Sequence, residues 1–191
     1  MSIQTIGIIG AGTMGNGIAQ TCAVSGLKVV MVDIAQAALD KGMATIDKSL
    51  ERLLSKDKIS AADKQAALGR ITTATSYDAF ANCDLVIEAA TENHALKIKI
   101  LQQVEAVLPE QTILASNTSS ISITQLAAVT KRADRFIGMH FFNPVPMMAL
   151  VEIIRGLQTS DATHDTVHDL AKRLGKSPIT VKNAPGFVVN R

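Results

Sequence analysis

Gly10-Ala11-Gly12-Thr13-Met14-Gly15 is the stretch of sequence that decides the fold, because it joins a strand pattern to a helix pattern. The apolar run Thr5–Ile9 precedes it, and Met14–Ser25 places apolar residues at helical spacing. The first glycine permits a tight turn, the second lets the backbone approach a pyrophosphate, and the third lets the helix pack closely on the strand. The N-terminus of the helix also offers free N–H groups and a partial positive charge to an anion.

An acidic residue follows the next strand pattern at the distance expected of a dinucleotide-binding unit. Lys28–Val32 is apolar and β-rich, and Asp33 lies directly after it, 18 residues beyond Gly15. A carboxylate at this place accepts hydrogen bonds from adenosine ribose hydroxyls and repels a 2′-phosphate. Residues 34–37 hold no cation that could receive such a phosphate, although Lys41 lies two turns into the following helix pattern. The sequence therefore predicts a site that prefers NAD to NADP, and a purely structural turn is the alternative.

Strand-like and helix-like segments alternate along the rest of the chain. Strands are expected at 71–73, 85–88, 112–115, 135–139, 150–154 and 179–181, and helices at 35–56, 61–68, 94–107, 122–130 and 161–173. Short links between such segments imply right-handed βαβ crossovers. We expect an α/β fold of the Rossmann type, with a doubly wound, mainly parallel sheet and a helical arm after its second strand.

Length and composition indicate one globular unit. The chain has 191 residues, 47% of them hydrophobic, and its 19 basic and 17 acidic residues give a formal net charge of +2. This balance gives no reason to expect nucleic acid or a membrane as a partner, and the apolar runs are far shorter than the roughly 20 residues of a membrane span. We expect residues 1–184 to form the NAD-binding domain. Pro185-Gly186 would then mark a boundary, with 185–191 beginning a helical C-terminal domain that is absent from this chain.

The two cysteines bear on compartment and on metal binding. Cys22 and Cys83 have no metal-ligand spacing, and both lie in apolar patterns. The N-terminus carries no basic segment or cleavage site of the kind that directs secretion. We expect buried free thiols, no metal site and a cytoplasmic location, with a disulfide as the less favoured alternative.

A histidine and a glutamate late in the chain are candidates for proton transfer. His140 follows the expected strand 135–139, at the edge where such sheets bind ligands, and Glu152 lies 12 residues later in the next expected strand. Two antiparallel strands joined by a turn at 141–146 would bring the two side chains together. A histidine oriented by a buried carboxylate is a usual base for an alcohol proton. The alternative is a strand-end histidine satisfied by an ordinary core glutamate, and spacing alone does not decide between them.

A polar cluster, Ser116-Asn117-Thr118-Ser119-Ser120, follows the expected strand 112–115 at the same edge of the sheet. On physical grounds alone, N-capping of the next helix is the expected use of any one of these hydroxyls. Contact with a ligand is the alternative.

Five separate blocks of sequence carry a resemblance to a known family. They are GAGTMGNGIAQ (10–20), VIEAATEN (86–93), ASNTSSISIT (115–124), GMHFFNPVP (138–146) with LVEIIRG (150–156), and PGFVVNR (185–191). With these blocks the chain resembles the NAD-binding domain of the 3-hydroxyacyl-CoA dehydrogenase family along its whole length, and most closely the bacterial 3-hydroxybutyryl-CoA branch. The resemblance implies reversible, NAD-dependent oxidation of an (S)-3-hydroxyacyl-CoA to the 3-oxoacyl-CoA. It also implies that the full-length protein is a homodimer formed through its C-terminal domain.

The resemblance further implies roles for individual residues in the reaction. His140 would take the proton of the C3 hydroxyl while C3 passes hydride to the nicotinamide, and Glu152 would orient the imidazole. Ser119 and Asn190 would hydrogen-bond the substrate.

Other positions match the cofactor and CoA contacts of the family. NAD contacts are implied at residues 10–15, Asp33, Glu92, Lys97, Ser119 and Asn143, and CoA contacts at Ser49, Lys56 and Ser119. Ser49 and Lys56 are two helical turns apart, so both can face one ligand. The alternatives are an ordinary surface ion pair for Glu92 with Lys97, and a solvated helix face for Lys56.

Two other functions stay open. One is a dehydrogenase for a hydroxy acid without CoA. The lysines of the expected helix 35–56 argue against it, because they suit the phosphates of CoA. The other is a non-catalytic NAD-binding module, which the missing C-terminal domain favours. Without that domain we expect NADH binding but poor turnover. The chain also departs from many relatives, because Met147-Met148-Ala149 stands where they carry a basic residue.

Overall fold

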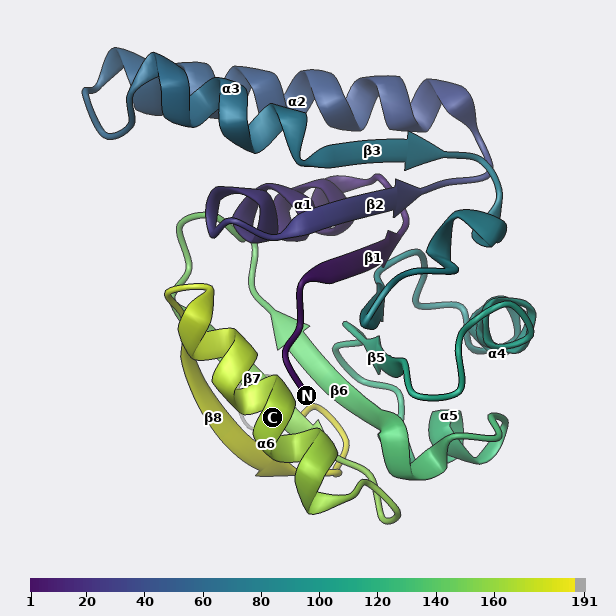
Figure 1. Cartoon of the computed structure of the whole chain (residues 1–191). Coiled ribbons are helices and arrows are strands. Elements are labelled where there is room, and N and C mark those ends of the chain that lie inside the picture. Colours follow the sequence, from purple (N-terminus) through teal and green to yellow (C-terminus); the bar gives the residue numbers. More distant parts are fainter. Residues whose placement is uncertain (188–191) are drawn as a thin grey trace.

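The structure, a computed structural model, describes residues 1–187 of the chain and is built on one sheet (Figure 1). Its strand order is β3-β2-β1-β4-β5-β6-β7-β8. The strands are β1 (Thr5–Ile9), β2 (Lys28–Val32), β3 (Ile71–Ala74), β4 (Leu85–Glu88), β5 (Ile113–Ser116), β6 (Phe136–Phe141), β7 (Leu150–Arg155) and β8 (Ser177–Lys182). Neighbouring strands are parallel except β6 and β7, which are antiparallel. The chain reverses its direction of travel across the sheet between β1 and β4, which is where doubly wound sheets bind ligands.

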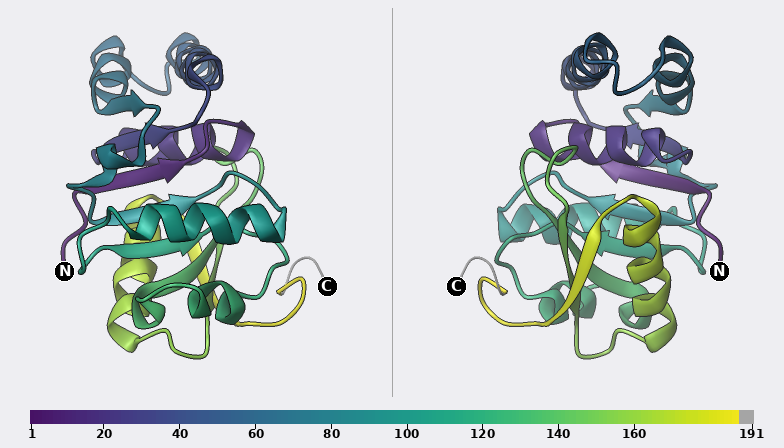
Figure 2. Two further views of the ribbon diagram at one scale, coloured as in Figure 1. Left: turned by 90° about the vertical axis from the view of Figure 1, so that its right-hand side faces the viewer. Right: turned by 90° about the vertical axis from the view of Figure 1, so that its left-hand side faces the viewer.

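Helices cover both faces of the sheet (Figure 2). They are α1 (Thr13–Val24), α2 (Gln36–Ser55), α3 (Ala61–Gly69), α4 (His94–Glu105), α5 (Ile123–Ala128) and α6 (Asp161–Arg173), with two short 3-10 turns, η1 (Tyr77–Phe80) and η2 (Ala133–Arg135). Buried residues of α1 and α6 join one hydrophobic cluster, and those of α4 and α5 join a second. The predicted Rossmann-type, doubly wound fold is therefore confirmed. Within residues 1–187, no helix combines the length and the hydrophobicity that crossing a membrane requires.

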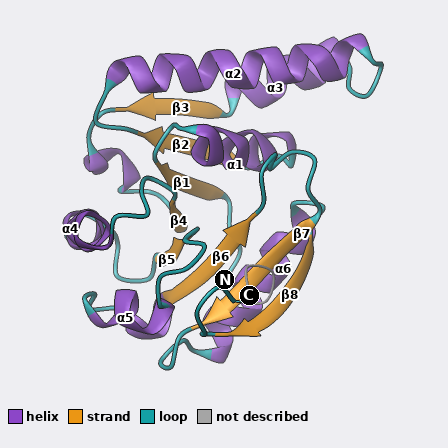
Figure 3. Ribbon diagram, turned by 180° about the vertical axis from the view of Figure 1, so that it is seen from behind, coloured by secondary structure: helices purple, strands orange, loops and turns teal. Residues whose placement is uncertain are grey.

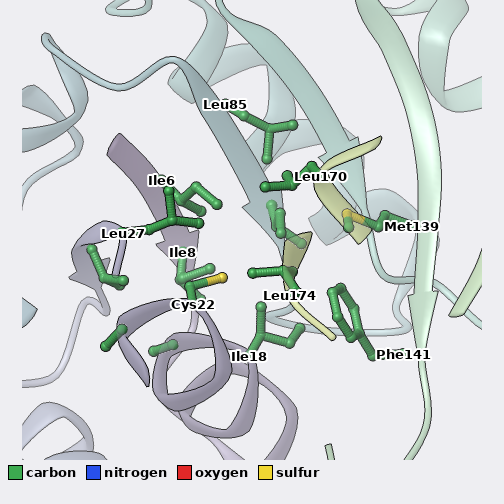
Figure 4. Packing of buried hydrophobic residues seen from close by; sticks show 14 of the residues in the cluster. Ile6, Ile8, Ile18, Cys22, Leu27, Leu85, Met139, Phe141, Leu170 and Leu174 are labelled. Carbon is green, nitrogen blue, oxygen red and sulfur yellow. The ribbon is translucent and has the colours of Figure 1, made fainter. Parts of the chain in front are cut away.

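The alternation of side chains along each strand builds these two clusters. In β1, Ile6 and Ile8 belong to one cluster and Ile9 to the other, because successive strand residues point to opposite faces. Figure 4 shows Ile6 and Ile8 packed near Ile18 and Cys22 of α1. Each fully buried isoleucine contributes roughly 1.5–3 kcal/mol. The loop between β1 and α1 is thus anchored in the core at both of its ends.

The helical arm predicted after the second strand consists of α2 and α3, which lie side by side beyond β3 (Figures 1 and 3). The buried face of α2 carries Leu39, Gly42, Ile46 and Leu50. Helix α3 begins at a capping box in which Ser60 and Asp63 each accept a hydrogen bond from the other's backbone N–H. A Cβ added to Gly42 would lie 2.8 Å from the carbonyl oxygen of Ala11. The arm therefore rests directly on the loop between β1 and α1.

Most predicted element boundaries lie within one or two residues of the observed ones, and two differences from the prediction affect the site. Strand β6 continues to Phe141, so His140 lies within the strand and not after its end. The side chain of Ser122 caps α5 by accepting a hydrogen bond from Gln125 N at 3.3 Å. Capping of this helix by the cluster 116–120 is therefore wrong, and those hydroxyls serve other purposes.

Cys22 and Cys83 are free thiols, and both are buried, as their apolar sequence context predicts. Desolvation by burial raises the pKa of each thiol to about 12. Because the thiolate is the reactive form, neither side chain is a nucleophile at neutral pH.

Candidate active site

The glycine loop has the backbone conformation that its sequence predicts. Gly10 has a φ of +101°, which side chains of L residues rarely adopt. A Cβ on Gly15 would lie 1.8 Å from the carbonyl oxygen of Gly10, so only glycine lets α1 start this close to β1. Gly10 N donates to Val32 O at 2.8 Å, which joins the loop to the end of β2. The tight turn at Gly10 and the close packing at Gly15 are confirmed.

Gly12 leaves open space on the side where a cofactor phosphate would approach. Nothing lies within 4 Å of a Cβ built on Gly12, whereas Gly10 and Gly15 are crowded. Gly12 is also the N-cap residue of α1, and no side chain caps this helix. The N–H groups of the first turn are therefore available to an anion. This open cradle fits the pyrophosphate of a dinucleotide.

Asp33 lies beside the glycine loop and orders it. Its Oδ2 accepts a hydrogen bond from Ala11 N at 3.0 Å, and its Oδ1 accepts one from Ala35 N at 3.1 Å. Next to Asp33 is a hollow of about 360 Å³, whose wall includes the exposed side chains of Ile34 and Leu96. Two apolar side chains beside a carboxylate at this place suit an adenosine.

His140 and Glu152 are direct partners in the antiparallel ladder of β6 and β7. His140 Nδ1 lies 2.9 Å from Glu152 Oε1, with His140 5% and Glu152 0% exposed. Because the carboxylate accepts this hydrogen bond, Nδ1 carries the proton and Nε2 of the neutral imidazole is an acceptor. The two antiparallel strands that the spacing predicted are confirmed, and they bring the pair into contact.

Aromatic rings flank the imidazole of His140. The ring of Phe142 is tilted against it at 4.5 Å between centroids, and the ring of Phe187 meets it edge-on at 5.8 Å. In the part of the chain that the structure describes, no residue forms a hydrogen bond with Nε2. The imidazole is thus oriented through Nδ1 and keeps an acceptor atom for a ligand.

Ser119 lies in the turn after β5, and Glu92 holds this turn from the side of β4. Glu92 accepts hydrogen bonds from Thr118 Oγ1 at 2.9 Å and from Ser119 N at 3.3 Å. In the same cluster, Asn117 Oδ1 accepts a hydrogen bond from Phe141 N at 2.8 Å. The polar cluster therefore links the end of β4 to the end of β6, across the edge of the sheet that carries the histidine.

Lys97 is buried, which excludes an ordinary surface ion pair with Glu92. The Lys97 side chain is only 1% exposed, and its Nζ lies 2.5 Å from Glu88 Oε1 and 3.9 Å from Glu92 Oε1. Glu88 is not among the site residues predicted from sequence, yet it is fully buried at the end of β4. A glutamate that closes an apolar strand pattern is the signal that could have found it, because a buried carboxylate needs a partner.

A second hollow, of about 400 Å³, lies between α1, α2 and the loop after β6. It is lined by both Ser49 and Lys56, the predicted CoA contacts, and by Thr13 and Asn143, which are predicted NAD contacts. Ser49 and Lys56 therefore face one groove, as their two-turn spacing predicts. Ser119, the third predicted CoA contact, does not line it, and neither do Asp33, Glu92 and Lys97 of the predicted NAD contacts.

Arg52, Gln20 and Met147 are among the residues of this groove that were not predicted from sequence. Arg52 lines it within one turn of Ser49, so that a second cation joins Lys56. Gln20 Nε2 donates to Ser49 Oγ at 2.9 Å and fixes the hydroxyl. Met147 also lines the groove and is 81% exposed. Helical spacing from Ser49 would have found Arg52, whereas Gln20 and Met147 come from other elements.

Asn190, the remaining predicted substrate contact, lies outside the described residues.

The family follows from a comparison with known proteins. A family model described as "3-hydroxyacyl-CoA dehydrogenase, NAD binding domain" matches residues 5–184. The chain belongs to this family. The resemblance carried by the five blocks is confirmed, and NAD is the cofactor of this 3-hydroxyacyl-CoA dehydrogenase domain.

Named relatives extend along nearly all of this 3-hydroxyacyl-CoA dehydrogenase domain. A 3-hydroxybutyryl-CoA dehydrogenase of Bradyrhizobium diazoefficiens is 49% identical over 189 residues, which are 99% of this chain and 64% of that protein. One of Clostridioides difficile is 47% identical over 186 residues, 97% of this chain and 66% of that protein. The crystal structure of (S)-3-hydroxybutyryl-CoA dehydrogenase PaaH1 from Ralstonia eutropha is 69% identical, with a TM-score of 0.98, and matches 100% of this chain and 67% of that one. The chain thus spans about two thirds of the length of these relatives.

Proposed function

We propose that the protein catalyses the reversible, NAD-dependent oxidation of (S)-3-hydroxybutyryl-CoA to its 3-oxoacyl-CoA. The observation that carries this proposal is the buried contact between His140 and Glu152, at the sheet edge that also holds the cradle at Gly12. The name of the relatives at 49% and 47% identity, 3-hydroxybutyryl-CoA dehydrogenase, supports the choice of substrate.

The proton chemistry falls to His140. In the proposed reaction, His140 Nε2 takes the proton of the C3 hydroxyl while Nδ1–H keeps its hydrogen bond to Glu152. The positive charge that forms on the imidazole lies next to a carboxylate that is 0% exposed, and this stabilises it. NAD, when bound, supplies the acceptor for the C3 hydride. A positioned general base of this kind contributes about 10²- to 10⁴-fold in rate. Ser119 and Asn190 hold the substrate oxygens.

The cofactor contacts are assigned to the glycine loop and to five residues that follow other strands or begin α4. They are residues 10–15, Asp33, Glu92, Lys97, Ser119 and Asn143. Support comes from the open space at Gly12, from the hollow beside Asp33, and from the buried ammonium of Lys97. The negative charge of Asp33 beside the adenosine hollow favours NAD over NADP.

The CoA moiety is assigned to the groove between α1 and α2, with Ser49, Lys56 and Ser119 as contacts. The cations of Arg52 and Lys56 attract its phosphates, and the apolar side chains of Leu53 and Met147 suit its pantetheine arm. This groove also favours a CoA thioester over a free hydroxy acid.

We further propose that residues 1–184 are the NAD-binding domain and that 185–191 lead into a C-terminal helical domain. The greater length of the relatives supports this division. The complete protein is then a homodimer through that domain. A cytoplasmic location is supported by the two buried free thiols.

Oxidation of NADH by the chain tests the proposed reaction, with acetoacetyl-CoA and free acetoacetate as rival substrates. Single turnover with the protein in excess reveals even a slow reaction. We expect NADH to be oxidised with acetoacetyl-CoA but not with free acetoacetate. Oxidation with the free acid alone would contradict the CoA assignment, and NADH binding without oxidation by either compound would identify a binding module.

A further inference from the structure

Glu88 is a buried charged residue that the proposed reaction leaves without a role. It ends β4 at the carboxyl edge of the sheet, and it is 0% exposed. Its carboxylate accepts hydrogen bonds from Lys97 Nζ at 2.5 Å, Ser116 Oγ at 2.7 Å and Ala90 N at 2.8 Å. Its backbone oxygen accepts one from Asn117 N at 2.8 Å. Glu88 therefore joins the loops that follow β4 and β5, the two strand ends nearest the cradle on that side.

Stability alone does not account for a buried pair of opposite charges. Removing two charges from water is costly, and an apolar pair of similar volume is often as stable. The charge of Lys97 therefore calls for an explanation other than stability. A buried ammonium that is to act on a ligand needs a counter-charge that holds it there, and Glu88 supplies one.

The ammonium of Lys97 keeps hydrogen-bonding capacity for a ligand. It has three N–H donors, and within residues 1–187 its one hydrogen bond is to Glu88. Glu92 Oε1, at 3.9 Å, contributes charge but is too distant for a hydrogen bond. The same Glu92 accepts the hydrogen bond of Ser119 N, so Lys97 Nζ lies between Glu88 and the turn that carries Ser119.

We infer that Glu88 is a positioning residue for the cofactor, which holds the Lys97 ammonium as a charged donor toward the bound dinucleotide without touching it. The inference rests on the proposed contact between Lys97 and NAD. Glu88 acts through Lys97, so its effect on NADH binding depends on the presence of that lysine.

A double-mutant cycle tests this dependence through NADH affinity, measured by calorimetry on the whole chain. The variants are Glu88→Gln, Lys97→Met and the two combined. Each single change is expected to weaken NADH binding by about 10- to 100-fold, the range of one charge-assisted hydrogen bond. The double variant is expected to bind NADH as Lys97→Met does, because Glu88 has no further effect once the lysine is gone. Additive losses would show that Glu88 acts by another route and would overturn the inference, as would unchanged affinity in Glu88→Gln.

Folding and cofactor binding are separated by a matched control. Glu105, at the other end of α4, pairs with Arg132 and is also largely buried. Glu105→Gln is expected to lower the urea midpoint while NADH affinity stays unchanged. If Glu88→Gln alone does not fold, the double variant, in which neither charge stays buried, is compared with Lys97→Met, and unequal affinities refute the inference. Failure of the unmutated chain to bind NADH would instead refute the proposed function.

Discussion

His140 Nδ1 and Glu152 Oε1 lie 2.9 Å apart because their residues face each other directly across two antiparallel strands. The carboxylate fixes the tautomer and the orientation of the imidazole. Replacement of Glu152 by Gln keeps the volume but removes the charge that stabilises the imidazolium. We expect kcat for acetoacetyl-CoA reduction to fall by about 100-fold or more, with little change in NADH affinity.

Stopped-flow measurement of NADH absorbance checks this prediction, and His140→Gln is the reference for complete loss of the base. Because removal of either member disables the same unit, the double variant should be no slower than His140→Gln alone. A Glu152→Gln protein with unaltered kcat would show that the carboxylate has no part in the reaction.

Replacement by alanine should have different effects at Gly12 and at Gly15, on NADH binding at the first and on stability at the second. The methyl group of Gly12→Ala enters open space, so the urea midpoint should stay constant while the Kd for NADH rises about tenfold or more. The methyl group of Gly15→Ala would meet the carbonyl oxygen of Gly10, so the free energy of unfolding should fall by about 3 kcal/mol. Urea denaturation and calorimetry on both variants check the contrast. Full NADH affinity in Gly12→Ala would refute the cradle.

Asp33 should determine the choice between NADH and NADPH. Asp33→Asn removes the charge that repels a 2′-phosphate and weakens the acceptor for the ribose hydroxyls. The Kd for NADH should rise about tenfold while that for NADPH falls. Asp84 is the control, because it also accepts two backbone hydrogen bonds, from Gln4 N and Thr5 N, yet lies at the opposite edge of the sheet. Asp84→Asn should alter stability without altering the ratio of the two affinities.

Lys56 should contribute to CoA binding through its charge. Lys56→Gln removes a cation from the groove wall, so KM for acetoacetyl-CoA should rise about three- to tenfold and depend less on salt. NADH affinity should not change. Lys58 is a matched control, because it is exposed on the same arm but does not line the groove. Equal effects of Lys56→Gln and Lys58→Gln would place CoA elsewhere.

The buried thiols should make the fold sensitive to alkali. Burial raises the pKa of Cys22 and Cys83 from 9.0 to about 12, so the folded state holds protons that the unfolded state releases above 9.0. The two protonated thiols therefore make their full contribution to the free energy of unfolding below pH 9.0. That contribution should decline as the pH rises toward about 12. Urea unfolding at several pH values measures this decline, and Cys22→Ala with Cys83→Ala should reduce it. Rapid reaction of either thiol with a disulfide reagent near pH 8 would contradict their burial.

The order of elements was predictable because each follows from local sequence. The strand, glycine loop, helix and acidic residue lie within one short segment, so the cofactor half needs no knowledge of distant contacts. The boundary at β6 was missed because what extends the strand is not local. Phe141 faces Val151 in the ladder with β7, and its backbone N–H donates to the side chain of Asn117, which follows the end of β5.

The burial of Lys97 was unpredictable for a related reason. Its position in the first turn of a helix is typical of an exposed side chain, and its partner belongs to the preceding strand. Spacing could likewise bring His140 and Glu152 together but could not say whether the pair is buried. The contact geometry and the burial come from the packing of β6 against β7 and of the helices on both sheet faces.

Gly42 is a position of the helical arm that a redesign of the groove cannot change without moving α2. Its missing side chain lets α2 rest on the carbonyl oxygen of Ala11, and an arm with a larger residue there must lift away from the glycine loop. The wall residues Thr45, Ser49 and Leu53 would then recede from the glycine loop with it. A library that varies these three positions but keeps Gly42 changes the groove wall while α2 keeps its contact with the glycine loop. The distance between the arm and the glycine loop is thus set by Gly42, whose side chain is a single hydrogen atom.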